Sequence, residues 1–291
     1  MNYKNKQKTI VLIVAICLIA AIISYGLYRF NADISSADAL DKLVITNLDV
    51  GKADAAIIQY NDAVGIIDTG TDEAFETIDS YLKKHGISNI SFMLLTHYDQ
   101  DHIGSAVEII NNYSIGTVYL PDYESEKEYY PALMDCISGK DNAIFVDNMQ
   151  SMDFADNISM DILPAEDPGP LLESDKNRDN DMSLCLMLYY EDCKFFFTGD
   201  IENDRISQMT DGTYNLSCDW IKIPHHGVYD KKEKKLIEKA SPTYAVISTS
   251  FEKAPEEKLR ELIKENDIKA YVTMNGDVTT ICDGSKITIK Q

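Results

Sequence analysis

The stretch that decides the fold is residues 94–104, LLTHYDQDHIG. The apolar run that ends at Leu95 predicts a buried strand, and the residues from Ile103 onward predict a helix. Between these two elements lie two histidines and two aspartates, His97, Asp99, Asp101 and His102. Imidazole nitrogens together with carboxylate oxygens are typical ligands of divalent metal ions. Capping a helix needs only one aspartate, so the pattern predicts a metal-binding turn.

Three further polar clusters lie next to predicted strands. Asp200 ends an apolar strand, directly after a glycine, and His225 and His226 follow the next predicted strand. The segment from Asn180 to Ser183 precedes another strand. Four of the five histidines of the chain lie in the opening turn or in this histidine pair. Loops at strand ends present ligands from a rigid scaffold, so we expect these clusters to converge.

The composition of the clusters suits a centre with two metal ions. Two divalent ions about 3.5–4 Å apart need a carboxylate that bridges them and terminal ligands on each side. Such ions lower the pKa of a shared water, so that hydroxide forms near neutral pH, and they neutralise charge that grows on a carbonyl or phosphoryl oxygen. Asp200 is the candidate bridging residue.

The first thirty residues differ from the rest of the chain. Three lysines precede residues 9–28, which carry no charge and are long enough to span a bilayer core of roughly 30 Å. The lysines predict an N-terminus in the cytoplasm and a single-pass protein of the cell membrane. We therefore expect a cytoplasmic basic tail, a transmembrane anchor, a short linker and a catalytic domain at residues 1–8, 9–30, 31–41 and 42–291. Cleavage of the apolar segment as a signal, giving a secreted protein, is the alternative. The catalytic domain is extracytoplasmic in both cases.

The charge and the cysteines limit the classes of partner and of fold. The net charge is −21, and residues 1–30 carry +4, so the remainder carries −25. Such a surface repels polyanions and disfavours DNA as a substrate. Five cysteines outside the anchor show no paired spacing, which gives no disulfide framework and no zinc-finger pattern. The sequence does not decide whether one disulfide bridge forms. It also indicates no protein partner.

Strands and helices are mixed in two similar halves. Strands are expected at residues 43–49, 53–60, 63–68, 92–95, 117–120, 143–146, 158–163, 183–190, 194–198, 220–223, 244–248, 270–273, 278–282 and 287–289. Helices are expected at residues 71–84, 104–112, 126–138, 201–209, 230–240 and 255–265. Residues 164–179 are expected to form a long loop that either covers the site or is flexible.

Six ordered motifs resemble the metallo-β-lactamase superfamily, and within it the metallo-β-lactamase-like domain of ComEC-type DNA-uptake competence proteins. They are LDVGKADA, DTG, THYDQDH, NDMSL, TGD and KIPHHG, at residues 48–55, 68–70, 96–102, 180–184, 198–200 and 222–227. The resemblance covers about 42–291. It implies an α/β (α+β) fold, a four-layer αβ/βα sandwich with the metal site at one edge between the two sheets.

The resemblance implies a role for each residue that matches a motif. His97 and Asp99 would bind the first metal ion, Asp101 and His102 the second, and Asp200 would lie between the two ions. One of His225 and His226 would complete the second site. We favour His226 as the ligand and His225 as the residue that faces the substrate. Asp101 would also orient the nucleophilic hydroxide.

Other matching residues would support the centre. Asn180 and Ser183 would lie near the first metal ion, and Lys222 would either meet a substrate phosphate or be an ordinary surface lysine. The remaining carboxylates would support ligands or shape turns, at positions Asp49, Asp54 and Asp68.

Departures from the pattern bear on the metal and on the substrate. Asp99 replaces the middle histidine of the superfamily's HxHxDH, as in the competence branch, so Mn²⁺ becomes an option beside Zn²⁺. Lys52 and Ala53 alter the GQG turn of that branch, and Val228 replaces its serine. A single spanning segment cannot form the DNA channel of those proteins.

These observations lead to three functional hypotheses. The first is a membrane-anchored, dinuclear metal-dependent hydrolase, a phosphodiesterase or nuclease-like enzyme that uses a metal-bridging hydroxide. The second keeps this chemistry but acts on a cell-envelope phosphodiester, as phosphorylcholine esterases of the superfamily do, or on a carboxylic ester or amide. The third is a non-catalytic surface binding module.

Overall fold

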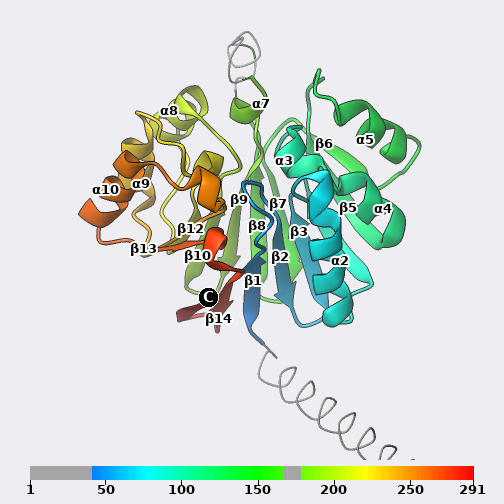
Figure 1. Ribbon diagram of the computed structural model, residues 1–291, viewed down its shortest axis with the longest axis horizontal. Helices are drawn as coiled ribbons and strands as arrows, with labels where there is room; N and C mark the ends of the chain where they lie inside the picture. The colour runs from blue at the N-terminus through cyan, green and yellow to red at the C-terminus, as the bar shows by residue number, and fades with distance from the viewer. Residues whose placement is uncertain (1–40, 167–168, 170–177) are drawn as a thin grey trace, which may run out of the picture. The chain divides into compact units, whose positions relative to one another are not determined.

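Two mixed β-sheets pack face to face, and helices cover the outer face of each sheet (Figure 1). The computed structural model describes residues 41–166, 169 and 178–291. Within this part, no helix has the length and apolar character needed to cross a bilayer. The predicted basic tail and transmembrane segment lie outside the described residues. Residues 42–291 form one unit, and their two-sheet architecture confirms the predicted sandwich.

The first sheet has eight strands in the order β15-β14-β1-β2-β3-β4-β5-β6. Strands β3 to β6 pair in parallel, and the other neighbours pair antiparallel. The strands are β1 Leu43–Asn47, β2 Ala56–Tyr60, β3 Ala63–Ile67, β4 Asn89–Leu94, β5 Ser114–Pro121, β6 Ala143–Val146, β14 Val278–Cys282 and β15 Ile287–Lys290. The helical segments of this half are η1 Asp72–Ala74, α2 Phe75–Lys84, α3 Gln100–Ile103, α4 Ala106–Asn112 and α5 Tyr130–Ile137.

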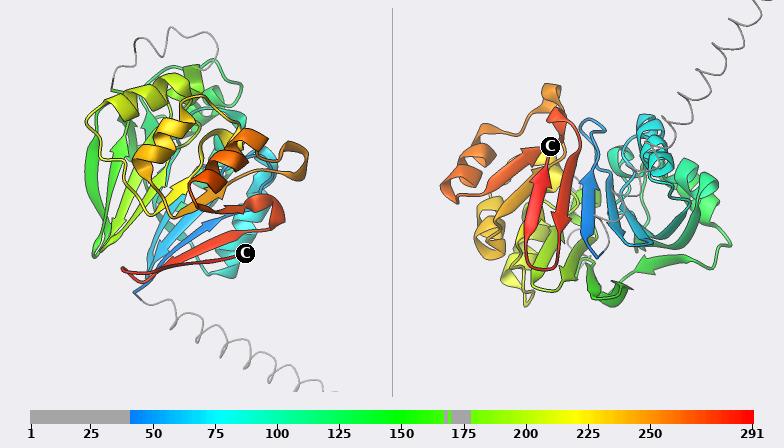
Figure 2. Two further views of the ribbon diagram at one scale, coloured as in Figure 1. Left: turned by 90° about the vertical axis from the view of Figure 1, so that its left-hand side faces the viewer. Right: turned by 90° about the horizontal axis from the view of Figure 1, so that it is seen from below.

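The second sheet has seven strands in the order β13-β12-β11-β10-β9-β8-β7, and here β10 to β13 are parallel. The strands are β7 Gln150–Ala155, β8 Ile158–Leu163, β9 Cys185–Tyr190, β10 Cys193–Phe197, β11 Trp220–Lys222, β12 Tyr244–Ile247 and β13 Lys269–Val272. The helical segments are α7 Arg178–Asp181, α8 Asn203–Asp211, η2 Pro224–Gly227, α9 Glu233–Ala240, η3 Phe251–Lys253, α10 Glu257–Glu265 and η4 Thr273–Asn275. Figure 2 shows the helices of each half on the outside of the two sheets.

Alternation of side chains along the strands builds three apolar layers. In β10, Phe195 and Phe197 belong to the core between the sheets, whereas Phe196 belongs to the core under α8, α9 and α10. In β4, Leu94 faces the space between the sheets and Met93 faces the helices of the first half. Central strands buried on both faces read as continuous apolar runs, which is why the sequence indicated them clearly.

The structure differs from the sequence-based expectations in three places. Strand β7, Gln150–Ala155, was not predicted, because it lies at a sheet edge and mixes polar with apolar residues. The helix expected at 104–112 starts earlier, as the short α3 at Gln100, so Asp101 and His102 are helical residues. Within 164–179, Arg178 already begins the helical turn α7. The five cysteines of the described part are free thiols.

Glu233 makes the stability of this fold depend on pH. It begins α9, is only 1% exposed, and its Oε1 has no hydrogen-bond partner among the described residues. Burial raises the pKa of this carboxyl from 4.5 to about 8. Because the folded pKa lies above the unfolded one, the stability that the protonated form supplies is complete below about pH 4.5 and is lost as pH rises towards 8.

We therefore expect Glu233→Gln to be neutral near pH 4.5 and stabilising at pH 8, by at least about 2 kcal/mol, since one pKa unit corresponds to about 1.4 kcal/mol. Urea unfolding at the two pH values measures the difference. Glu238→Gln, which changes an exposed carboxylate of the same helix, is the control. An equal effect of Glu233→Gln at both pH values would contradict this assignment.

Candidate metal centre

The predicted ligands gather at the edge where the parallel strands of both sheets end. The loop after β4 and the helix α3 supply one group, and the loops after β10 and β11 supply the other. In chain order the residues are His97, Asp101, His102, Asp200 and His226. The three histidines and Asp200 are buried. The structure therefore brings together residues that are more than one hundred positions apart in the sequence.

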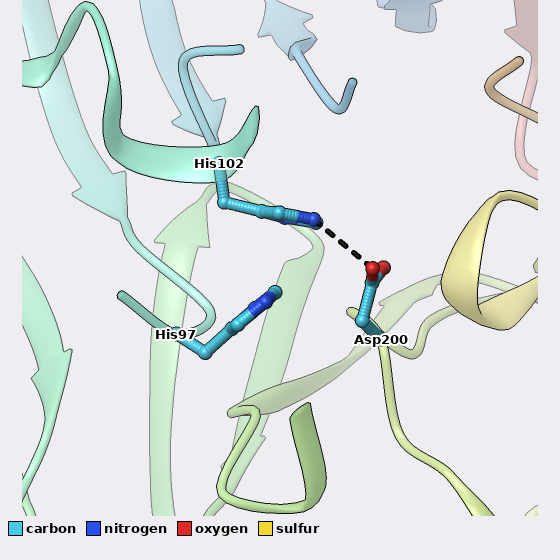
Figure 3. A group of neighbouring side chains, drawn as sticks. All are labelled: His97, His102 and Asp200. Carbon is cyan, nitrogen blue, oxygen red and sulfur yellow. Dashed lines mark ion pairs between the residues drawn. The ribbon is translucent and has the colours of Figure 1, made fainter. Parts of the chain in front are cut away.

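Asp200 faces His97 and His102 (Figure 3) and also lies next to His226. Its Oδ2 is 3.3 Å from His102 Nε2 and 3.2 Å from His226 Nε2. His97 points to the same place, and its ring centroid lies 4.1 Å from that of His102. Within the described residues, Nε2 of each of the three histidines is buried without a hydrogen-bond partner, as is Asp200 Oδ1. Buried, unpaired ligand atoms that converge in this way fit a metal ion.

In the part of the chain that the structure describes, His102 belongs to three groups of close donor atoms, and two of these groups consist of predicted ligands. In the first set, atoms of His97, His102 and Asp200 lie within 4.8 Å of one another, and in the second set the same holds for Asp101, His102 and His226. Asp101 Oδ2 also lies 3.3 Å from His226 Nε2. The second set contains the three side chains that the sequence analysis assigned to the second ion.

Asp99 is placed differently from the expectation that pairs it with His97. It belongs to none of the close donor groups found among the described residues. Its Oδ1 instead lies 2.6 Å from the Nζ of Lys127, in the segment before α5. Asp99 is therefore not among the close donor atoms of the first set, although the sequence analysis assigned it to the first metal ion.

A strained turn separates the roles of the two neighbouring histidines. His225 and His226 both adopt left-handed backbone conformations, with φ of 48° and 55°, and Gly227 follows with φ of 82°. Such conformations are rare in residues other than glycine and often mark functional sites. The turn buries His226 against Asp200 and leaves the His225 side chain 23% exposed, with its Nδ1 3.3 Å from Glu202 Oε1. This geometry favours His226 as the ligand.

Groups behind the histidines fix their orientation. Asp68 accepts hydrogen bonds from the backbone N–H and the hydroxyl of Thr96, at 2.7 and 2.8 Å, and lies 2.8 Å from His102 Nδ1. The Nδ1 of His226 lies 3.1 Å from the carbonyl oxygen of Ser248. With Nδ1 engaged on this side, Nε2 of both rings points at Asp200. Thr96 and Ser248 were not predicted, although Thr96 directly precedes His97 in the quoted motif.

The structure corrects the prediction for Lys222. It is neither a surface lysine nor open to a substrate, because it is only 4% exposed. Its Nζ lies 2.5 Å from Asp54 Oδ2, directly behind the histidines. Burial opposes the charged form of Lys222, but the Asp54 carboxylate outweighs burial and raises the lysine pKa. Lys222 therefore acts as an internal cation that balances a buried carboxylate.

The other predicted supporting residues lie at or near the centre. Ser183 Oγ accepts a hydrogen bond of 3.2 Å from the backbone N–H of Asp200, whereas the Asn180 side chain donates to Glu202. Gly199 must stay a glycine, because its φ is +57° and a Cβ there would lie 2.9 Å from that of Ser183. Asp49 is exposed, and its Oδ1 accepts from the Gly51 N–H within the turn.

Burial and charge prepare the centre for cations. Burial opposes ionisation of Asp200, but His226 and His102 hold the pKa of Asp200 well below its usual range. Burial, and then the charge of His102, lower the pKa of His97 to about 4, so this imidazole is neutral near pH 7. An ionised carboxylate and a neutral imidazole are the forms that bind a metal ion. Burial opposes the charged form of His102 and His226, but the Asp200 carboxylate raises the pKa of both rings, so these two would lose a proton when a metal ion binds.

The comparisons with known proteins agree with this geometry. The model of the metallo-beta-lactamase superfamily matches residues 48–250. ComE operon protein 3 of Bacillus subtilis is 23% identical over 205 residues, which are 68% of this chain and 25% of that protein. Competence protein ComA of Neisseria gonorrhoeae is 24% identical over 267 residues, 89% of this chain and 34% of that protein. The chain thus spans a quarter to a third of the length of these relatives.

Solved structures share the fold at low sequence identity. The metallo-beta-lactamase fold protein YhfI from Bacillus subtilis gives a TM-score of 0.53 at 11% identity, over 85% of this chain and 100% of that chain. Igni18, a metallo hydrolase from Ignicoccus hospitalis, gives a TM-score of 0.54 at 13% identity, over 86% and 99% of the two chains.

Asp68→Asn tests the support of His102. An amide oxygen can accept from either Thr96 or His102, but its NH₂ group then faces the other donor. We expect metal affinity to fall about 10- to 100-fold, the range for losing such a support. Titration of the apoprotein with Zn²⁺ measures the loss. Asp219→Asn, which alters a carboxylate that accepts from the Lys194 N–H at the opposite end of β11, should bind as the wild type does. Equal losses in the two variants would contradict the assignment.

Lys222→Met tests the internal cation. Removing the lysine leaves Asp54 charged and buried, which should destabilise the fold by about 3–5 kcal/mol in urea unfolding at pH 7. The double variant Asp54→Asn with Lys222→Met should recover part of this loss, because neither charge then remains. A double variant that is less stable than Lys222→Met alone would show that the pair does not act as described.

Proposed function

Because the chain belongs to the metallo-beta-lactamase superfamily and is a metal-dependent hydrolase of that fold, we propose that it is a dinuclear phosphodiesterase. The observation that carries this proposal is the convergence on Asp200 of three buried histidines, whose Nε2 atoms make no hydrogen bond within the described residues. In the proposal, His97 and Asp200 hold one ion, and His102, His226, Asp101 and Asp200 hold the other. Asp99 would join the first ion only by giving up its contact with Lys127. Zn²⁺ and Mn²⁺ both suit these nitrogen and oxygen donors.

Each residue of the centre has a distinct task. Two divalent ions, when bound, lower the pKa of a shared water and neutralise charge on the phosphoryl group. Asp101 is partly exposed, with 28% of its side chain accessible, and would orient the attacking water by accepting a hydrogen bond from it. His225 faces outward beside Glu202 and would contact the substrate. The buried histidines would hold the ions, and Asp68 and Ser248 would keep their rings aligned.

The choice of a phosphodiester rests on the motifs shared with the competence branch and on the two relatives named as a competence protein and a ComE operon protein. Membrane anchoring through residues 9–30, with the domain outside the cytoplasm, belongs to the same proposal. The net charge of −21 disfavours a long DNA strand. It favours a second candidate, a cell-envelope phosphodiester with a cationic headgroup.

The test is hydrolysis of bis(p-nitrophenyl) phosphate by the full chain with Mn²⁺ or Zn²⁺. We expect metal-dependent turnover, and Asp101→Ala should lower kcat/KM at least about 100-fold because the variant loses both a ligand and the group that orients the water. Asp211→Ala, which removes an exposed carboxylate paired with Lys235 at the far end of α8, is the matched control.

Two results would overturn the proposal. Full occupancy by metal without turnover of any phosphodiester would point to a carboxylic ester or amide as substrate. A chain that binds no divalent ion at all would leave only a binding role for the fold.

A further inference from the structure

The metal centre has one open edge. His97, His102 and His226 are buried, whereas Asp99, Asp101 and His225 keep 24%, 28% and 23% of their side chains accessible. A substrate must approach from the side of these three residues, because the opposite side is closed by the Asp54–Lys222 pair and by Asp68.

Two lysines from different segments stand at this edge. The Nζ of Lys127 lies 2.6 Å from Asp99 Oδ1, and the Nζ of Lys52 lies 3.6 Å from Asp101 Oδ2. Lys52 belongs to the turn between β1 and β2, and Lys127 precedes α5. Burial first, and then charges that include Lys52, lower the pKa of His225, so Lys52 also acts on the third open residue.

Lys52 and Lys127 differ from Lys222 because their ammonium groups stay accessible for a second contact. Lys222 is enclosed, and its ammonium group is used by Asp54. The side chains of Lys52 and Lys127 are 31% and 42% accessible, and an ammonium group has three donors, of which a carboxylate contact uses only part. Both lysines can therefore hold their aspartate and still offer a positive charge to a molecule at the open edge.

We propose that Lys52 and Lys127 form a pair of anion-binding residues that selects substrates with a negative charge next to the bond that is cleaved. The proposal rests on the proposed phosphodiesterase function and names the property by which its substrate is recognised. A chain of net charge −21 repels anions at long range. Two cations at the mouth of the centre offset this repulsion where a phosphodiester must bind, and lysine is a common partner of phosphate.

The charge of residue 52 can be removed while a side chain of similar character is kept. Glutamine preserves much of the length and the hydrogen-bonding ability of the side chain but removes the charge. Lys52→Gln therefore isolates the contribution of the positive charge.

The experiment compares Lys52→Gln, Lys127→Gln and their double variant with Lys52→Arg and Lys127→Arg, which keep the charge. The control is Lys83→Gln. Lys83 is exposed, and its Nζ lies 2.7 Å from Asp79 Oδ2. It belongs to the last turn of α2, which leads to the start of β4, whereas the centre lies at the end of the parallel strands. Three quantities are measured in the full chain: bound metal, equilibrium binding of inorganic phosphate by calorimetry, and KM and kcat for bis(p-nitrophenyl) phosphate at several salt concentrations.

We expect each Gln variant to weaken phosphate binding about 5- to 10-fold and to raise KM by a similar factor, while metal content and kcat change little. The double variant should lose more, and its KM should depend less on salt. The Arg variants and Lys83→Gln should stay within about 2-fold of the wild type.

Two outcomes overturn the inference. In one, phosphate affinity and KM stay unchanged in the double variant. In the other, the Gln variants lose metal, which would show that the lysines only position Asp99 and Asp101. Failure of the proposed function looks different, since the wild type would then hydrolyse no phosphodiester. Phosphate binding that depends on both lysines would support the inference even in that case.

Discussion

The carboxylate of Asp68 joins the three segments on which the metal centre depends. Asp68 directly follows β3 and has a left-handed φ of 56°. Its carboxylate accepts from Thr96 after β4 and contacts His102 on α3. A backbone hydrogen bond links two of these segments as well, since the Thr69 N–H donates to the His102 carbonyl at 2.7 Å. The orientation of His102, which both donor sets share, is therefore set by a residue that lies behind the centre rather than in it.

The same region concentrates negative charge that the fold must balance. Asp54, Asp68 and Asp200 are buried around two histidines, and isolated buried charges are costly. Lys222 balances Asp54 from behind, and each Asp54 oxygen also lies within 4 Å of a histidine Nδ1. On the front side, the rings of His102 and His226 are the main partners that favour the charged form of Asp200. Divalent cations bound at this point would add to the charge balance of this acidic arrangement.

Local patterns predicted much of the fold and of the centre. The residues around His97 and His226 follow buried strands directly, and parallel strands that end at one edge bring such residues together. Contacts between distant segments were not predictable in this way. The ion pairs of Lys222 with Asp54 and of Lys127 with Asp99 join positions 168 and 28 residues apart, and no local pattern indicates either partner. Strand β7 was missed because its half-exposed edge position does not require an apolar alternation.

The core between the sheets fixes the distance between the two halves of the centre. Leu94, Phe197 and Trp220 pack in this one core, and each lies within a few residues of a proposed ligand. A close-packed core changes little in volume, so the ligands of the first half stay in register with those of the second half. The open edge has no such support, since Lys52 and Lys127 lie on connecting segments. The buried side is thus suited to hold ions in a fixed geometry, and the loop side is free to adapt to the charge and shape of a substrate.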